Sequence, residues 1–207
     1  MADAAASPPL IVRRLGRVEY STTWQAMQAF TAQRGPDTID ELWLLEHPPV
    51  FTLGLAGRRS HILRATDIPI IASDRGGQVT YHGPGQIVAY LLLDLRRRGY
   101  GVRELVQRME QAVIDLLADY GIEGRRRDKA PGVYVAEKKI AALGLRIRQG
   151  RSYHGLGLNV DMDLAPFGWI DPCGYPGLEV TQLRDLGVAE PLPAVAERLA
   201  GRLASRL

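Results

Sequence analysis

One cysteine is the residue of this sequence best suited to covalent chemistry. Cys173 is the only cysteine among 207 residues, and it lies in the run Asp-Pro-Cys-Gly-Tyr-Pro-Gly at 171–177. Buried structural cysteines usually lie in apolar strands or helices, whereas this glycine- and proline-rich context presents the sulfur, which favours a nucleophile over a core residue. A free thiol has a pKa of about 8.5, so a nucleophilic cysteine needs a neighbour that favours the thiolate. The candidates for that neighbour are His82, His154 and a pair of adjacent lysines.

The lysine pair can be resolved by strand geometry. The chain has 26 basic residues, of which only Lys129, Lys138 and Lys139 are lysines. Residues 139–147 read as a strand, and alternate residues of a strand point to opposite faces. Lys139 is in phase with the apolar residues of that strand, so we predict that Lys139 points inward and Lys138 outward. An inward lysine can serve as a desolvated base or as the ion-pair partner of a thiolate, and an ordinary snorkelling lysine is the alternative.

A second polar stretch, residues 75–86, combines four glycines with six hydrogen-bonding side chains. It precedes the apolar run 87–95, which reads as a buried strand. Glycines without a Cβ let a ligand approach the backbone closely, and a simple turn does not need so many donors and acceptors. We therefore expect a ligand-binding loop. The polar side chains are those of Arg75, Gln78, Thr80, Tyr81, His82 and Gln86.

The remaining elements predict an α+β domain with a mixed sheet. Residues 1–9 are expected to form a flexible leader, and residues 10–207 a single catalytic domain. Strands outnumber helices without regular βαβ alternation, and the strands at 132–135 and 139–147 form a hairpin. Further strands are expected at 10–18, 41–45, 50–53, 68–72 and 151–160, and helices at 21–34, 102–120, 180–186 and 193–203. His47 breaks two of these strands and is expected to be a structural turn residue.

Composition excludes several functional classes. The sequence has no Walker motif, no nucleophile elbow and no metal-ligand spacing, so we predict that the protein uses neither a metal nor a cofactor. No apolar run has the length of a membrane span, residues 1–12 lack the charged and apolar regions of a secretory signal, and a lone cysteine fits a reducing cytoplasm. The arginine runs 96–98 and 125–127 lack interleaved aromatic residues, which argues against nucleic acid. They are either solvated surface or a docking site for an acidic protein.

Several separated motifs in one order resemble the lipoyl(octanoyl) transferase family. They are LEHPPVFTLG at 45–54, RGGQVTYHGPGQ at 75–86, KIAALGLRI at 139–147, SYHGLGLN at 152–159 and DPCGY at 171–175. The resemblance spans about residues 10–187. It implies the catalytic-domain fold of biotin and lipoate protein ligases. It also implies transfer of octanoyl from octanoyl-acyl carrier protein to a lysine of lipoyl domains, in 2-oxoacid dehydrogenase complexes and the glycine cleavage H protein.

The resemblance also assigns roles to residues. Cys173 is the nucleophile that forms an acyl thioester, and Lys139 activates it. The predicted substrate-binding residues are Arg75, Gly76, Gly77, Gln78, Val79, Thr80, Tyr81, His82, Ala142, Leu143, Gly144, Gly155, Leu156 and Gly157. Glycines in this set leave room for the acyl chain and expose N–H groups to the thioester oxygen.

Three other functions remain open at this point. A lipoate protein ligase shares the fold but makes an acyl-adenylate, needs ATP and Mg²⁺, and has no use for Cys173. An octanoyl amidotransferase acting between two lipoyl carriers uses a cysteine too, expected elsewhere in the chain. A silent module that binds a lipoyl domain or fatty acid would not need both Lys139 and Cys173.

Overall fold

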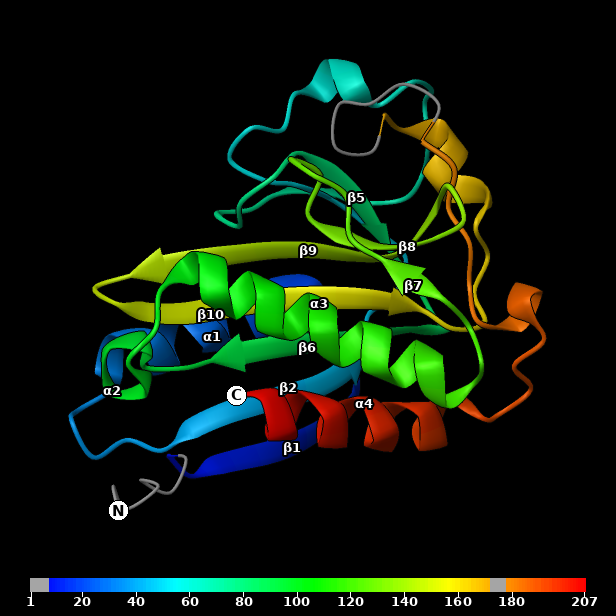
Figure 1. The fold of residues 1–207 in the computed structure, drawn as a ribbon. Helices are drawn as coiled ribbons and strands as arrows, with labels where there is room; N and C mark the ends of the chain where they lie inside the picture. Colours follow the sequence, from blue (N-terminus) through cyan, green and yellow to red (C-terminus); the bar gives the residue numbers. More distant parts are fainter. Residues whose placement is uncertain (1–7, 172–177) are drawn as a thin grey trace.

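Two β-sheets organise the part of the chain that this computed structural model describes, residues 8–171 and 178–207 (Figure 1). Within these residues the larger sheet has the order β1-β2-β6-β10-β9-β8-β7 and the smaller one the order β4-β3-β5. The pairs β1·β2 and β3·β4 are parallel and the other neighbours antiparallel, which confirms the predicted mixed sheet. The strands are β1 (Leu10–Arg17), β2 (Asp40–Glu46), β3 (Val50–Leu53), β4 (Ile70–Ala72), β5 (Val79–His82), β6 (Gln86–Leu92), β7 (Gly124–Arg125), β8 (Gly132–Val135), β9 (Lys138–Arg148) and β10 (Arg151–Asn159).

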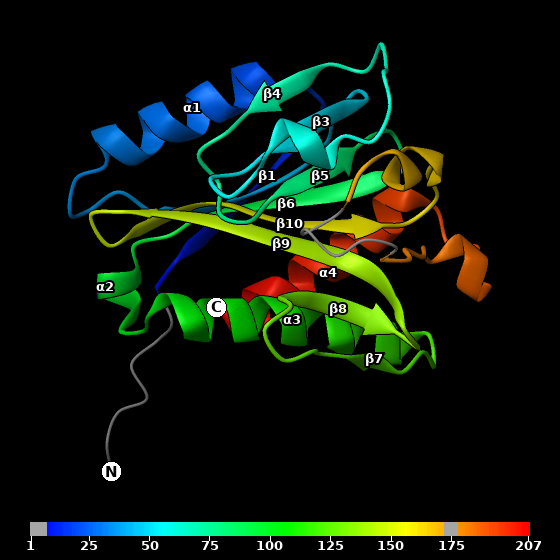
Figure 2. The same ribbon diagram turned by 90° about the horizontal axis from the view of Figure 1, so that it is seen from above.

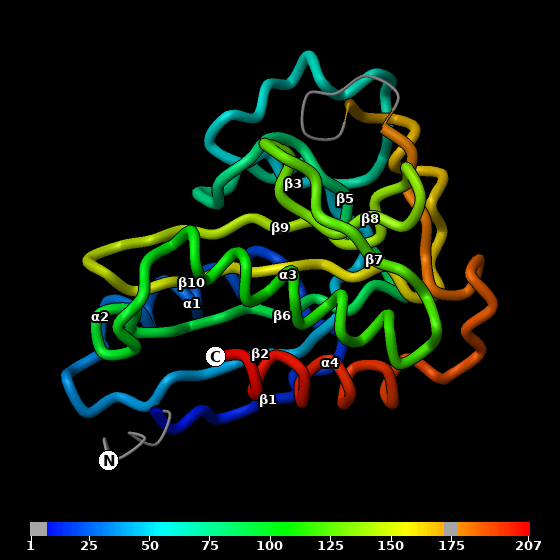
Figure 3. Tube along the Cα trace, in the orientation of Figure 1, coloured from blue at the N-terminus to red at the C-terminus, as the bar shows by residue number. Residues whose placement is uncertain are grey.

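Helices cover both faces of the larger sheet (Figure 2). α3 (Val102–Asp119) and α4 (Leu192–Arg206) bury their apolar sides with the sheet in the main core, and α1 (Tyr20–Gln33) packs on the opposite face through Met27. The smaller sheet lies over the β9 side of the larger one (Figures 1 and 3). Among the described residues, no helix is both long enough and apolar enough to cross a membrane.

The central strand and the longest helix follow from their sequence patterns. Every residue of β6 is buried, as its nearly continuous apolar run requires. α3 repeats apolar residues at helical spacing, and Leu105, Met109 and Leu116 are fully buried. Gly121 follows the helix with a φ of +71°, the left-handed conformation that a glycine C-cap adopts at least cost. These predictions are confirmed.

Three predicted elements differ from the structure. Residues 79–82 of the expected loop form β5, because they pair with β3. The apolar run ends as a strand at Leu92, and residues 95–98 form the short helix α2 (Leu95–Arg98), which Asp94 caps through its side chain. The helix predicted at 180–186 is wrong: Val180 bridges to Lys139, and only Arg184–Leu186 form a 3₁₀ turn.

The arginine run 96–98 is not simply solvated surface. Asp40 is fully buried and binds Arg34, Arg97 and Arg98, with its Oδ2 2.5 Å from Nε of Arg98. The side chain of Arg98 is 1% exposed. Buried charges of this kind are tolerated only when they are paired and hydrogen-bonded, so the run fixes α2 against the end of α1 and the start of β2.

Candidate active site

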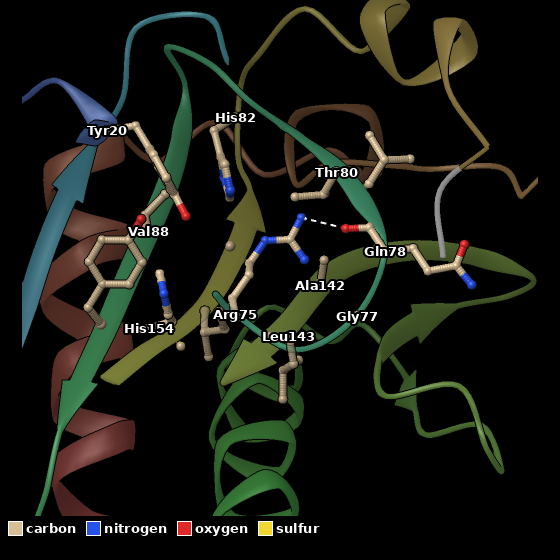
Figure 4. A pocket seen from close by; sticks show the side chains of 16 residues that line it. Tyr20, Arg75, Gly77, Gln78, Thr80, His82, Val88, Ala142, Leu143 and His154 are labelled. Atoms are coloured by element: carbon tan, nitrogen blue, oxygen red, sulfur yellow. Dashed lines mark hydrogen bonds between the residues drawn. The ribbon is translucent and has the colours of Figure 1, made fainter. Parts of the chain in front are cut away.

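Arg75 holds the glycine-rich loop in place. Its guanidinium group donates to the backbone carbonyl oxygen of Thr52 over 2.6 Å, to that of Gln78 over 2.8 Å and to that of Gly76 over 3.0 Å. Figure 4 shows the bond to Gln78 at the rim of the pocket. Arg75 is 7% exposed, so it brings a positive charge into the space between the sheets while fixing the loop. Its contacts with backbone carbonyls predict a positioning role alongside any contact with substrate.

The loop is also attached to both sheets through its backbone. Gly54, which follows β3, donates to the carbonyl of Gln78 over 2.8 Å, and Gly76 donates to the carbonyl of Leu145 in β9 over 2.8 Å. A Cβ on Gly54 would lie 2.4 Å from the carbonyl oxygen of Gly77, so this position requires glycine. The loop therefore connects the smaller sheet to the larger one through backbone hydrogen bonds.

A narrow cavity of about 50 Å³ lies between this loop and strands β9 and β10 (Figure 4). Twelve of the fourteen predicted substrate-binding residues line it: Arg75, Gly77, Gln78, Val79, Thr80, His82, Ala142, Leu143, Gly144, Gly155, Leu156 and Gly157. The fold thus brings three separated motifs to one place. Their contact with a substrate stays a prediction.

Two predicted binding residues lie elsewhere. The ring of Tyr81 packs against Phe51 and Phe167, with centroids 5.4 and 5.5 Å away, in the core of the smaller sheet. Strand alternation explains this, because Tyr81 lies between two residues of β5 that face the cavity. Gly76 lines an adjoining groove instead.

Gly155 is a glycine because a neighbouring strand of the sheet lies too close for a side chain, not because the cavity needs the space. A Cβ on Gly155 would lie 1.9 Å from the carbonyl oxygen of Ala89 in β6. The space that its missing side chain leaves is therefore occupied by the backbone of the neighbouring strand. By contrast, a Cβ on Gly157 would meet the flexible end of the Gln86 side chain at 3.0 Å.

Part of the cavity lining, which we call the inner wall, was not predicted from the sequence to bind substrate. It consists of Tyr20, Val88, Tyr90 and His154. The hydroxyl of Tyr20 lies 2.6 Å from that of Ser73. These residues come from α1, β6 and β10, and of the four only His154 was named from the sequence, as a candidate activator of the thiol. Asp74 directly precedes Arg75 in the sequence, and its carboxylate holds His154 in this wall.

Asp74 accepts hydrogen bonds from four side chains. They are Trp24, Gln28, Tyr153 and His154, with a distance of 2.9 Å between Oδ1 and Nε2 of His154. Burial alone would raise the pKa of Asp74, but these hydrogen bonds lower it well below its usual range. The carboxylate is therefore ionised at neutral pH, and Nε2 of His154 donates to it.

The histidines near the cavity are neutral at pH 7. Burial lowers the pKa of His82 to about 3 and that of His47 to about 4. Burial also lowers the pKa of His154, although Asp74 opposes this shift. His47 is fully buried with its ring nitrogens 2.6 Å from the Val18 carbonyl oxygen and 2.7 Å from the Tyr90 hydroxyl. It is structural, as predicted, and His82 and His154 are too weakly basic to be favoured as activators of a thiol.

Lys139 points inward, as strand alternation predicts. It is 4% exposed, and its Nζ donates to the carbonyl of Pro131 over 3.2 Å and lies 5.2 Å from the ring centroid of Tyr134. Lys138 points outward and lies 3.6 Å from a carboxylate oxygen of Glu179. The inward lysine therefore lies in an apolar and aromatic setting, where an amine can be desolvated.

The backbone of Lys139 pairs with the segment that follows the cysteine motif. Its N–H donates to the carbonyl of Glu179 over 2.9 Å, and its carbonyl accepts from the N–H of Thr181 over 3.0 Å. Cys173 lies outside the described residues, so its proximity to Lys139 stays a prediction. Within residues 8–171 and 178–207, no group of three or more metal-ligating side chains could hold a metal ion.

Comparison with known proteins identifies close relatives. The family described as the lipoyl protein ligase A/B catalytic domain matches residues 19–204. An octanoyltransferase of Azoarcus sp. (strain BH72) is 67% identical over 95% of this chain and 87% of its own length. An octanoyltransferase of Thiobacillus denitrificans is 69% identical over 87% of this chain and 83% of its own length.

Solved structures share the fold at much lower identity. A bi-partite lipoate protein ligase of Thermoplasma acidophilum has a TM-score of 0.76 at 16% identity, covering 96% of this chain and 84% of its own. A lipoate-protein ligase A bound with ATP has a TM-score of 0.75 at 15% identity over 97% and 85%. The biotin protein ligase of Aquifex aeolicus has a TM-score of 0.57 at 14% identity over 95% and 69%. The predicted ligase-like fold is confirmed.

Proposed function

The chain belongs to the lipoyl protein ligase A/B catalytic-domain family, and we propose that within it the chain is an octanoyltransferase. In this proposal octanoyl moves from octanoyl-acyl carrier protein to a lysine of a lipoyl domain. The observation that carries the proposal is that curated relatives 65–69% identical over 87–95% of this chain share the name octanoyltransferase. The cavity supports it, because predicted acyl-contacting residues from three motifs surround one space.

The proposed reaction passes through a thioester on Cys173. The Cys173 sulfur attacks the carbonyl carbon of the donor thioester, a new C–S bond forms, and the carrier thiol leaves with a proton. The amine of the acceptor lysine then attacks the enzyme thioester, the amide forms, and the Cys173 thiol is regenerated. Atoms balance without ATP, because each acyl bond that breaks is a thioester.

Lys139 is the residue we assign to activate Cys173. Cys173 is six residues from Glu179, whose carbonyl binds the Lys139 N–H, and six residues span at most about 20 Å. The length of the chain therefore permits the thiol to reach the lysine. The lowered pKa values of His82 and His154 leave lysine as the better candidate for taking the thiol proton or balancing the thiolate.

A ligase mechanism is the second candidate, because the similar folds include a lipoate-protein ligase A bound with ATP. A ligase would form an acyl-adenylate and would not require a thiol. Replacing Cys173 by Ser separates the two: the transferase loses activity, whereas a ligase retains it.

The remaining expectations complete the proposal. The acceptors are lipoyl domains of 2-oxoacid dehydrogenase complexes and the glycine cleavage H protein, and the compartment is the cytoplasm. The catalytic unit is residues 10–207, and no cofactor is needed. The acidic carrier would meet basic surface near residues 125–127, although each of these arginines already has an acidic neighbour in Glu123, Glu110 or Glu137.

The decisive experiment is the intact mass of the protein after mixing with octanoyl-acyl carrier protein, without ATP or acceptor. We expect one octanoyl adduct that hydroxylamine releases and that Cys173→Ala abolishes. Octanoylation of the acceptor from free octanoate and ATP, with no adduct, would instead identify a ligase.

A further inference from the structure

A groove of about 440 Å³ adjoins the candidate acyl cavity. Gly77, Gln78, Leu143 and Gly144 line both hollows, so the two meet where the glycine-rich loop lies against β9. Lys139, which is 4% exposed, lines the groove together with Lys129 and Pro131. An acyl carbonyl near Lys139 would therefore have the cavity on one side and the groove on the other.

The far wall of the groove is apolar and partly open to solvent. Val102 and Val106, one turn apart at the start of α3, face the groove, while Leu105 and Met109 of the same helix are buried in the core. Val102 is 42% exposed, and Leu55, next to the groove residue Ala56, is 63% exposed. Exposed apolar side chains gathered around one hollow mark an interaction surface.

The charges of the groove favour an anionic occupant. Lys129 is exposed and Lys139 is buried, and both line the groove. These two amines favour a chain that is apolar along its length and carries a phosphate at the end remote from the acyl group.

We infer that this groove receives the phosphorylated thiol arm that carries the acyl group, with the phosphate near Lys129. The inference rests on the proposed function, since it names where the donor of that reaction lies. The acyl chain occupies the cavity, the thioester lies near Lys139, and the arm leaves along Val106 and Val102 to the surface.

The test uses two truncated donors, octanoyl-phosphopantetheine and octanoyl-pantetheine, which differ only in the phosphate. The full chain is acylated with each donor, and the rate is followed by intact mass. Lys129→Ala is expected to raise the KM for the phosphorylated donor, relative to the other, by about tenfold, as expected for loss of a charge-assisted contact. Lys138→Ala is the matched control, because Lys138 is an exposed lysine on the opposite face.

A second variant tests the apolar wall. Val106→Trp is expected to lower kcat/KM for both donors by a larger factor than for p-nitrophenyl octanoate, which has no arm. Val102→Glu, on the more exposed turn, provides an independent test if Val106→Trp folds poorly. It is expected to weaken the phosphorylated donor more than the other by placing a carboxylate at the rim.

The outcomes separate this inference from the proposed function. If the unmodified protein forms no adduct with any donor, both are overturned. If it forms the adduct and the variants treat all donors alike, the groove inference alone is overturned. It is also overturned if Val106→Trp slows only transfer to the lipoyl domain, because the groove would then receive the acceptor lysine.

Discussion

Nε2 of His154 lies 2.9 Å from Oδ1 of Asp74, and this pair joins the residue before the glycine-rich loop to a strand that lines the cavity. His154 has a φ of +60° inside β10, a conformation that is costly for a residue with a side chain. The same carboxylate binds Trp24 and Gln28 of α1. The wall of the cavity is therefore positioned by α1, β10 and the loop together.

The buried histidines predict that the protein loses stability on mild acidification. The folded pKa values of His47 and His82, about 4 and about 3, lie below the value of about 6.5 expected in the unfolded chain. Below pH 6.5 the unfolded state therefore takes up protons that the folded state does not. We expect the free energy of unfolding, measured in urea, to fall by about 3 kcal/mol between pH 7 and 5.

His82→Gln should flatten part of this slope, and a stability that stays constant over this range would contradict the assignment. Asp74 affects the free energy of unfolding in a different pH range. Its pKa is lowered on folding, so its contribution is present above about pH 4 and is lost as the pH falls further.

The inner wall predicts which acyl chains are accepted. Val88 is 1% exposed and is one of the apolar residues that line the cavity. Val88→Ala should admit a longer chain, and one extra buried methylene contributes about 0.8 kcal/mol. We expect the ratio of kcat/KM for decanoyl over octanoyl donors to rise at least about threefold.

Val88→Phe should shift the preference toward hexanoyl donors. Val133→Ala, an equally buried truncation in the main core, controls for a general loss of packing. Unchanged ratios in both Val88 variants would mean that the acyl chain does not reach this wall.

Lys139 is predicted to matter for the first acyl transfer. Lys139→Ala should slow single-turnover acylation by about 100-fold or more, the usual effect of removing an acid–base group. Lys138→Ala, the adjacent outward lysine, should have little effect. Lys139→Arg then distinguishes two roles: a retained rate indicates a charged partner of the thiolate, and a lost rate indicates a titrating base. Equal rates for Lys138→Ala and Lys139→Ala would remove Lys139 from the mechanism.

Gly155 is predicted to be required for folding rather than for binding. Its Cβ would overlap the carbonyl of Ala89, and overpacking against backbone costs about 1–3 kcal/mol or more. We expect Gly155→Ala to lower the free energy of unfolding by at least about 2 kcal/mol. Gly168→Ala, where a Cβ meets nothing within 4 Å, should change it by less than about 0.5 kcal/mol. Equal stability of the two variants would show that the strands can separate to accommodate the methyl group.

Local patterns predicted most of the elements because their signals lie within a few residues. The apolar phase of β9 was enough to place Lys139 inside and Lys138 outside, and helical spacing located α3. The helix predicted near residue 180 failed because the backbone of Glu179 and Thr181 is satisfied by Lys139, a partner some forty residues away. Tertiary pairing of this kind leaves no local pattern.

The glycine-rich loop was singled out by its composition, but the residues that hold it in place were not. Thr52 and Asp74 hold Arg75 and His154 in place, and neither was assigned this role from the sequence, although Asp74 directly precedes Arg75. Tyr81 was predicted to bind substrate with its neighbours, but it does not line this cavity, because a contiguous motif does not distinguish the two faces of β5. The inner wall, formed by Tyr20, Val88 and Tyr90, depends on which strands become neighbours.

Because the glycine-rich loop is bonded to both sheets, hydrogen exchange at its backbone amides should report whether an acyl chain occupies the cavity. The N–H of Gly54, at the end of β3 in the smaller sheet, bonds to the loop, and the N–H of Gly76 in the loop bonds to β9 of the larger sheet. An acyl chain lodged between the sheets would contact both and so oppose their separation. Deuterium uptake at these two amides should slow together on acylation, which makes the pair an internal reporter of a loaded enzyme.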